Sequence, residues 1–151
     1  MSWIFMDKLV TEDSIPSGAI GFVYKIVHIP TDKFYIGKKN LVSTRRIKLG
    51  KKELQVIKES RKLEKKGGRL PSKKTVTKDS DWEIYYSSND EIQKMVADGN
   101  ADEFKREIIQ FCFSKKALSY YELYWQFKYE VLTENSFNSN IAGSYYRKDL
   151  I

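Results

Sequence analysis

The sequence contains few of the cysteine and histidine residues that form disulfides and metal sites in many small proteins. Its 151 residues include one cysteine, Cys112, and one histidine, His28. A single thiol excludes a disulfide within the chain and favours a reducing compartment. One cysteine and one histidine also disfavour a zinc site. The N-terminal stretch MSWIFMDKLV has neither the basic start nor the long apolar run of a signal peptide or membrane span. We therefore expect a soluble, cytoplasmic protein that does not contact a membrane.

What the chain does have is an excess of positive charge, concentrated in one segment. The net charge is +7 overall. Between Arg45 and Lys78, fourteen Lys and Arg residues stand against three acidic residues, a local charge of +11, whereas the remainder carries −4. A solvated helix with a linker is one explanation of this segment. Contacts with phosphates explain better why charge of one sign gathers in an otherwise acidic chain.

Short apolar runs and capping residues predict a small α/β (α+β) domain with a three-stranded antiparallel sheet flanked by helices. Strands are expected at 20–28, 33–37 and 104–113, and Pro30-Thr31-Asp32 supplies the turn between the first two. Helices are expected at about 51–66, 90–98 and 115–132, where capping candidates include Asn89 and Ser114. Residues 71–80, PSKKTVTKDS, predict a flexible basic loop.

The same pattern predicts one domain with appended ends. We expect an N-terminal arm at 1–19, the domain itself at 20–142 with a basic helical and loop insert at 45–80, and a C-terminal tail at 143–151.

One acidic residue of the last expected helix, Glu122, stands among apolar neighbours. It has Leu118 four residues before it, and Trp125 and Gln126 three and four residues after it. A carboxylate on an apolar helix face is costly without a partner or a metal ion. From the helix alone, a side chain that reaches solvent or pairs with a lysine is the favoured explanation of Glu122.

Five elements in order resemble the GIY-YIG nuclease family. They are FVY at 22–24, YIG at 35–37, an arginine ten residues after the second tyrosine (Arg45), a glutamate on a later helix (Glu122, in YYELYW), and an asparagine after an aromatic residue in FNSNIAG. The resemblance covers residues 20–142. The wider pattern is most similar to phage-encoded members, which resemble homing or mobile-element endonucleases.

The resemblance implies a metal-dependent DNA endonuclease whose catalytic residues are Tyr24, Tyr35, Arg45 and Glu122. Glu122 would hold one Mg²⁺ or Mn²⁺ ion, because Mg²⁺ accepts few protein ligands and keeps its waters. Arg45 would bind phosphate oxygens, and the two tyrosines would position the water. A tyrosine is a poor base unless its pKa is lowered, for which Lys38, Arg45 and the metal are candidates.

The supporting residues expected from this resemblance are Gly37, which would leave room for DNA, and Lys38, Tyr86, Asn138 and Asn140. One departure concerns the position one turn after the arginine, where many members have His or Tyr and this chain has Leu49. Tyr85 or Tyr86 is the candidate to replace that aromatic residue. The basic residues expected to contact DNA are Lys39, Arg46, Lys58, Arg61, Lys62, Lys65, Lys66, Arg69, Lys73 and Lys74.

Other classes of function stay open at this stage. The chain is expected to bind DNA. Whether it forms a homodimer is left open by the sequence. It could have kept the fold as a catalytically inactive DNA-binding module, or be a basic RNA-binding protein whose aromatic residues stack on bases. A ββα-metal nuclease of the HNH type is disfavoured by the single histidine.

Overall fold

A computed structural model describes residues 2–65 and 67–150. Within two strands it leaves the side chains of residues 43–47 and 75–77 undescribed. The helices are α1 (Lys51–Glu64), α2 (Asp90–Ala97) and α3 (Lys115–Lys128), with 3₁₀ turns η1 (Glu12–Ser14), η2 (Ala101–Glu103) and η3 (Arg147–Asp149). The strands are β1 (Trp3–Phe5), β2 (Lys8–Leu9), β3 (Gly21–His28), β4 (Lys33–Asn40), β5 (Val42–Lys48), β6 (Lys73–Asp79), β7 (Phe104–Cys112), β8 (Asn140–Ile141) and β9 (Tyr145–Tyr146).

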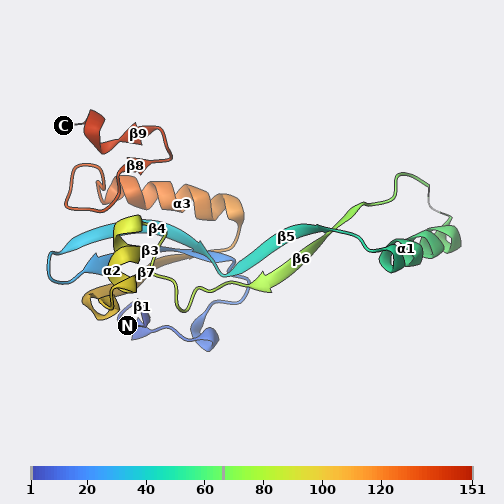
Figure 1. Cartoon of the computed structure of the whole chain (residues 1–151), viewed down its shortest axis with the longest axis horizontal. Coiled ribbons are helices and arrows are strands. Elements are labelled where there is room, and N and C mark those ends of the chain that lie inside the picture. The colour runs from blue at the N-terminus through green and yellow to red at the C-terminus, as the bar shows by residue number, and fades with distance from the viewer. Residues whose placement is uncertain (1, 66, 151) are drawn as a thin grey trace. The chain divides into compact units, whose positions relative to one another are not determined.

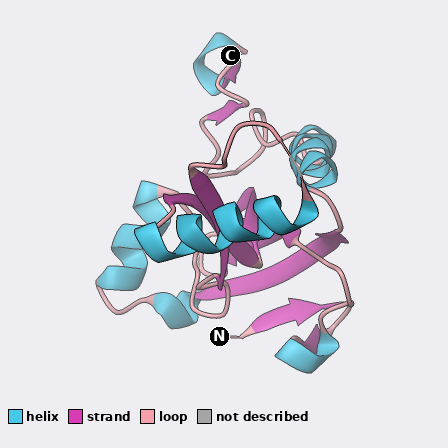
Figure 2. Ribbon diagram, turned by 90° about the vertical axis from the view of Figure 1, so that its right-hand side faces the viewer, coloured by secondary structure: helices cyan, strands magenta, loops and turns pink. Residues whose placement is uncertain are grey.

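The chain divides into two compact units, which are described separately. The first unit comprises residues 1–41 and 80–151, and the second comprises residues 42–79. The larger unit contains a five-stranded sheet in the order β2-β1-β7-β3-β4. Its helix α3 lies on one side of these strands and α2 on the other (Figures 1 and 2).

The antiparallel sheet expected from the sequence is confirmed, and its three strands form one side of this larger sheet. β3 pairs with β4 on one side and with β7 on the other, both antiparallel. The N-terminal arm adds β1, parallel to β7, and β2 beyond it. β4 therefore forms an edge of the sheet, and it is longer than the strand expected at 33–37.

Alternation along the strands gives the sheet two apolar faces. Val23 and Ile36 pack with Leu118 of α3 on one face. On the other face the rings of Phe22 and Tyr24 contact Trp3 edge to face, with centroids 5.0 and 5.4 Å apart. Aromatic pairs of this geometry stabilise beyond the area they bury. Burial on both faces fixes the register of β3 and β4.

Capping residues set the helix boundaries much as expected. The Asn89 side chain accepts from the Ile92 amide at the start of α2, and Ser114 accepts from the Ala117 amide at the start of α3. α3 ends at Lys128, earlier than the predicted 132. α1 ends before its expected glycine pair, because Lys65 adopts the left-handed conformation with φ of 53°.

The smaller unit corrects one prediction. Residues 71–80 were expected to form a flexible loop, but β6 occupies most of them and pairs antiparallel with β5, from Val42 opposite Asp79 to Lys48 opposite Lys73. The physical reason is the β-branched run Thr75-Val76-Thr77, which favours extended backbone although lysines surround it. α1, which joins the two strands, buries none of its described residues.

Among the described residues, no helix combines the length and the apolar character needed to cross a bilayer.

Candidate active site at the edge of the sheet

The two motif tyrosines lie side by side on one face of the β3–β4 hairpin. Tyr24 stands opposite Gly37, and Tyr35 opposite Ile26, so all four residues face the same side. The centroids of the two phenol rings are 6.1 Å apart. Tyr24 is 1% exposed, whereas Tyr35 is partly exposed. The hairpin thus places one enclosed phenol beside one that is open to the surface.

Gly37 makes this tyrosine pair sterically feasible. A Cβ at this position would lie 2.6 Å from Tyr24 Oη and 2.8 Å from Tyr35 Cε1. From the sequence we expected the missing side chain to leave room for DNA. In the structure, the space next to Gly37 is occupied by the two phenol rings.

Glu122 reaches the same place from α3, on the opposite face of the sheet. Its carboxylate accepts a hydrogen bond from the backbone amide of Lys38 in β4. One helical turn later, Gln126 Nε2 donates to the Ile36 carbonyl, 3.1 Å away. Side chains of α3 therefore satisfy backbone groups that an edge strand would otherwise leave unpaired.

Asn138 bonds to both backbone groups of Ile36 on that edge. Its Oδ1 accepts from the Ile36 amide at 3.1 Å, and its Nδ2 donates to the Ile36 carbonyl at 3.0 Å. The asparagine side chain thus imitates a neighbouring strand at Ile36. Asn140 has a different role in the structure, because its Oδ1 accepts from the Gly143 amide at 3.0 Å in the following turn.

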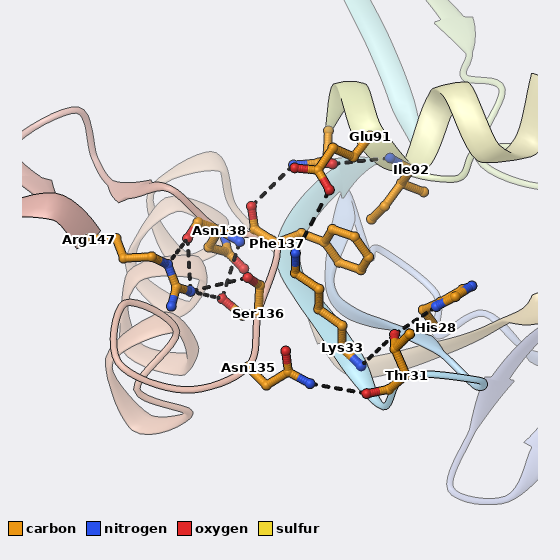
Figure 3. Close-up of polar contacts among 11 residues, drawn as sticks. His28, Thr31, Lys33, Glu91, Ile92, Asn135, Ser136, Phe137, Asn138 and Arg147 are labelled. Carbon is orange, nitrogen blue, oxygen red and sulfur yellow. Dashed lines mark hydrogen bonds and ion pairs between the residues drawn. The ribbon is translucent and has the colours of Figure 1, made fainter.

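The loop that carries Asn138 is held by Arg147. The guanidinium of Arg147 donates to the carbonyls of Ser136 and Asn138, both at 3.2 Å (Figure 3). It also donates to the carbonyls of Glu134, at 2.9 Å, and Val131. Asn89 Nδ2 also donates to the Phe137 carbonyl at 3.3 Å. The predicted C-terminal tail therefore contributes a residue that fixes the position of Asn138.

These residues surround one polar pocket of about 340 Å³. Four predicted residues line it, namely Tyr35, Glu122, Asn138 and Asn140. The other lining residues were not expected from the sequence to have site roles, and they are Ser88, Asn89, Asp90, Gln126, Phe137, Ser139 and Ala142. For Gln126, the spacing of one helical turn from Glu122 was the available signal.

The ionisation of the site follows from its burial. Burial is the main cause that raises the pKa of Glu122, although the Lys38 charge and backbone amide act in the opposite direction. Burial also raises the pKa of Tyr35, and it raises that of Tyr24 well above the usual value, with Tyr85 as the next cause. Both phenols therefore keep their protons at neutral pH in the free protein.

Of the two candidates for an additional aromatic residue, Tyr85 lies next to the motif tyrosines. Its ring meets that of Tyr24 edge to face, with centroids 5.8 Å apart. Lys39 Nζ lies 4.1 Å from the centroid of the Tyr85 ring and forms an ion pair with Asp81 at 2.6 Å. Tyr86, the residue chosen from the sequence, stacks instead on the guanidinium of Arg106 at 4.1 Å.

Comparison with known protein families agrees with this arrangement. A family model described as "Putative endonuclease segE, GIY-YIG domain" matches residues 3–150. The chain belongs to the GIY-YIG family. It is therefore a nuclease domain, of the class of hydrolases that act on phosphodiester bonds. A search of curated proteins and a search of solved structures found no match.

The arginine expected from the sequence to be catalytic lies in the second unit. Arg45 belongs to β5, where it is paired with Val76, but its side chain lies outside the described part of the structure, as does that of Arg46. Lys66 also lies outside the described residues. The catalytic role of Arg45 therefore stays a prediction.

The described basic residues of the second unit gather mainly at α1. Lys58, Arg61, Lys62 and Lys65 line one cavity of about 500 Å³. Two of the predicted DNA contacts, Arg61 and Lys74, are engaged within the unit. Arg61 donates to the carbonyls of Gly68 and Arg69, and Lys74 forms an ion pair with Glu53.

The donor set of the pocket fits a divalent cation of the Mg²⁺ class. Mg²⁺ is usually held by one or two carboxylates and retains several of its waters. Glu122 supplies one carboxylate, and the buried Oε1 of Gln126 is an acceptor without a hydrogen-bond partner in the described structure. Within the described residues no cluster of three or more His, Cys, Asp or Glu side chains occurs. The pocket is thus suited to an ion that needs few protein ligands.

Proposed function

We propose that this GIY-YIG protein is a metal-dependent DNA endonuclease, encoded by a phage or mobile element. The observation that supports the proposal is the convergence of Tyr35, Glu122 and Asn138 on one polar pocket from three separate segments. A fold that had lost catalysis would have no need to keep a half-buried carboxylate beside a tyrosine in a polar pocket.

In the proposed reaction, Glu122 would hold the divalent cation. The bound cation would polarise the phosphate and stabilise the leaving oxygen. The partly buried carboxylate has a raised pKa in the free protein, so the positive charge of Lys38 and the cation itself would favour its ionised form. The Lys38 amide fixes the orientation of this carboxylate.

The tyrosines would act chiefly by hydrogen bonding. Because burial keeps both phenols protonated, Tyr35 Oη can donate to a phosphate oxygen and orient the attacking water. A phenol acts as the general base only if bound substrate and cation lower its pKa against this burial. Arg45 would bind non-bridging phosphate oxygens through its forked guanidinium.

The substrate is proposed to be DNA, bound in part by the basic residues of the second unit. Lys58 and Lys62 of α1 and Lys65, which follows the helix end, line one cavity, as expected for contacts to phosphates that carry little sequence information.

The test is cleavage of supercoiled plasmid DNA with Mg²⁺ and with a chelator. Wild-type protein should nick the plasmid only when Mg²⁺ is present. Glu122→Gln should abolish nicking while leaving DNA affinity and the melting temperature close to those of the wild type. A matched control is Glu130→Gln, because Glu130 is exposed beyond the end of α3 and does not line the pocket.

Three outcomes would contradict the proposal. Nicking by purified Glu122→Gln protein would remove Glu122 from the mechanism. Binding without cleavage by the wild type would indicate an inactive DNA-binding module, and cleavage confined to RNA would identify the other substrate.

A further inference from the structure

Gln126 has a buried oxygen that the fold leaves without a partner. The residue is 6% exposed and lines the polar pocket together with Glu122. Its Nε2 donates to the Ile36 carbonyl, but its Oε1 accepts no hydrogen bond from any residue that the structure describes. Buried acceptors are rarely left in this state, because losing their contact with water costs stability.

The orientation of this amide is chemically determined. The Ile36 carbonyl is an acceptor, so the NH₂ group of Gln126 must face it, and Oε1 must point away. Moreover, the same carbonyl already receives a hydrogen bond from Asn138. Satisfying Ile36 therefore does not explain why a glutamine, with an orphan oxygen, occupies this position.

The partner of Oε1 is either a hydrogen-bond donor or a cation, because an amide oxygen offers only lone pairs. Mg²⁺ takes few protein ligands and keeps most of its waters, which favours a donor such as a bound water over direct contact with the ion. A phosphate oxygen is excluded because it is itself an acceptor. Glu122 stands one helical turn earlier, and residues four apart on a helix have Cβ atoms about 5–6 Å apart. A water bound to Mg²⁺ lies about 2.1 Å from the ion and donates a hydrogen bond over about 2.7 Å. A water of a cation held by Glu122 is thus within reach of the Gln126 side chain, which lines the same pocket.

We propose that Gln126 Oε1 accepts a hydrogen bond from a water of the divalent cation held by Glu122. Gln126 is then a positioning residue for the cation. The hydrogen bond from its NH₂ group to the Ile36 carbonyl of β4 fixes the direction in which Oε1 points. This inference rests on the proposed function, because it requires Glu122 to bind the cation. Partners of this kind orient the coordination sphere, and their removal weakens metal binding by about 10- to 100-fold.

The test measures binding of Mn²⁺ to the DNA-free protein, from the electron paramagnetic resonance signal of unbound Mn²⁺. Gln126→Met keeps the length of the side chain and removes the amide, and it should weaken Mn²⁺ binding by about 10- to 100-fold. The matched control is Gln110→Met. Gln110 is also a partly buried glutamine, whose Oε1 accepts from Trp125 Nε1 at 2.9 Å, but it does not line the pocket. Its replacement should leave Mn²⁺ affinity unchanged.

A second measurement needs no variant and covers the case in which Gln126→Met fails to fold. In wild-type protein, the side-chain amide resonance of Gln126 should shift when Mg²⁺ is added, whereas that of Gln110 should not. If an ordinary structural water satisfies Oε1, the Gln126 resonance will not shift when Mg²⁺ is added, and the inference is overturned.

The outcomes separate this inference from the function on which it rests. No Mn²⁺ binding by the wild type would refute the metal site at Glu122 itself. Tight binding by the wild type and equally tight binding by Gln126→Met would refute only the role of Gln126. A matching decrease in Gln110→Met would show a general effect of glutamine removal and would also overturn the inference.

Discussion

At the scale of single residues, the Tyr35 phenol is the motif hydroxyl that reaches the polar pocket. Tyr24 is enclosed by Trp3, Tyr85 and Gly37, whereas Tyr35 lines the pocket and lies 3.4 Å from Ser88 Oγ. A substrate can therefore contact the Tyr35 hydroxyl directly. The hydroxyl of Tyr24 is enclosed by the neighbouring rings, and Tyr24 does not line the pocket.

Tyr35→Phe should lower the cleavage rate by about 10²–10⁴, because it removes a hydroxyl that orients the water or its phosphate while keeping the ring. Single-turnover cleavage at saturating Mg²⁺ measures this effect, and thermal unfolding checks the fold. Tyr129→Phe is the control, since Tyr129 packs against Phe34 and Lys25 away from the pocket. Equal rates for Tyr35→Phe and the wild type would assign Tyr35 a packing role only.

Glu122 and the two tyrosines could be named from the sequence because their order and spacing resemble the GIY-YIG pattern, although each residue alone was weak evidence. Glu122 interrupts an apolar face, and the tyrosines stand at fixed distances around a turn. Gln126 could not be chosen in the same way. A glutamine on a helix is ordinary, and only the Ile36 carbonyl, brought close by folding, shows that its oxygen has no partner among the described residues.

At the scale of elements, the site is built by completing the edge of β4. Its outward-facing backbone groups are bound by the 135–137 segment at Phe34, by Asn138 at Ile36 and by Glu122 at Lys38. Such an edge would otherwise be free to pair with another strand. The polar groups that protect this edge also form a wall of the pocket. The hydrogen bonds of Asn138 to Ile36 therefore both complete the sheet edge and place Asn138 in the site.

Gly37→Ala should disturb this element more than a small substitution usually does. The added methyl would overlap both phenol rings, so the free energy of unfolding should fall by about 1–3 kcal/mol. Cleavage should slow as well, because the rings must move. Gly67→Ala is the control, since a Cβ there meets no atom within 4 Å. Urea unfolding and plasmid cleavage measure the two effects. If Gly37→Ala has the unfolding free energy and the cleavage rate of the wild type, the two rings can move aside without loss of stability or activity, and the prediction is wrong.

Helices proved more predictable than strands, for a local reason. Asn89 and Ser114 mark helix starts through bonds to residues three positions away, which a sequence displays directly. The pairing of β5 with β6 joins segments separated by all of α1, and the lysines of β6 obscure its β-branched run. β1 was likewise expected only within an appended strand or arm, because its parallel pairing with β7 depends on residues about a hundred positions away.

At the scale of the whole molecule, charge and chemistry are divided between the two units. The described pocket belongs entirely to the first unit, whereas the +11 segment between Arg45 and Lys78 falls in the second. Outside that segment the chain has a charge of −4. The first unit alone therefore has little electrostatic attraction for a polyanion, and affinity for DNA should depend on the second.

This division predicts that affinity for DNA can be reduced without changing the rate of cleavage at saturating protein. We expect simultaneous Lys→Gln changes at Lys58, Lys62 and Lys65 to weaken binding to all DNA sequences alike. If each lysine neutralises one phosphate, the slope of log affinity against log salt should flatten by about 2.7, or about 0.9 for each lysine replaced. Arg61 is left intact because it holds the 68–69 backbone.

The control removes the same charge from exposed positions of the first unit, by Lys→Gln changes at Lys8, Lys94 and Lys148. These should change the salt slope much less, because they neutralise charge that does not lie against phosphates. At saturating protein both triple variants should cleave at the wild-type rate, since Tyr35 and Glu122 are unchanged. Equal slopes for the two variants would mean that affinity follows total charge and that the α1 lysines face solvent. A new cleavage pattern in the α1 variant would instead show that this helix binds bases, because phosphate binding alone carries no sequence information.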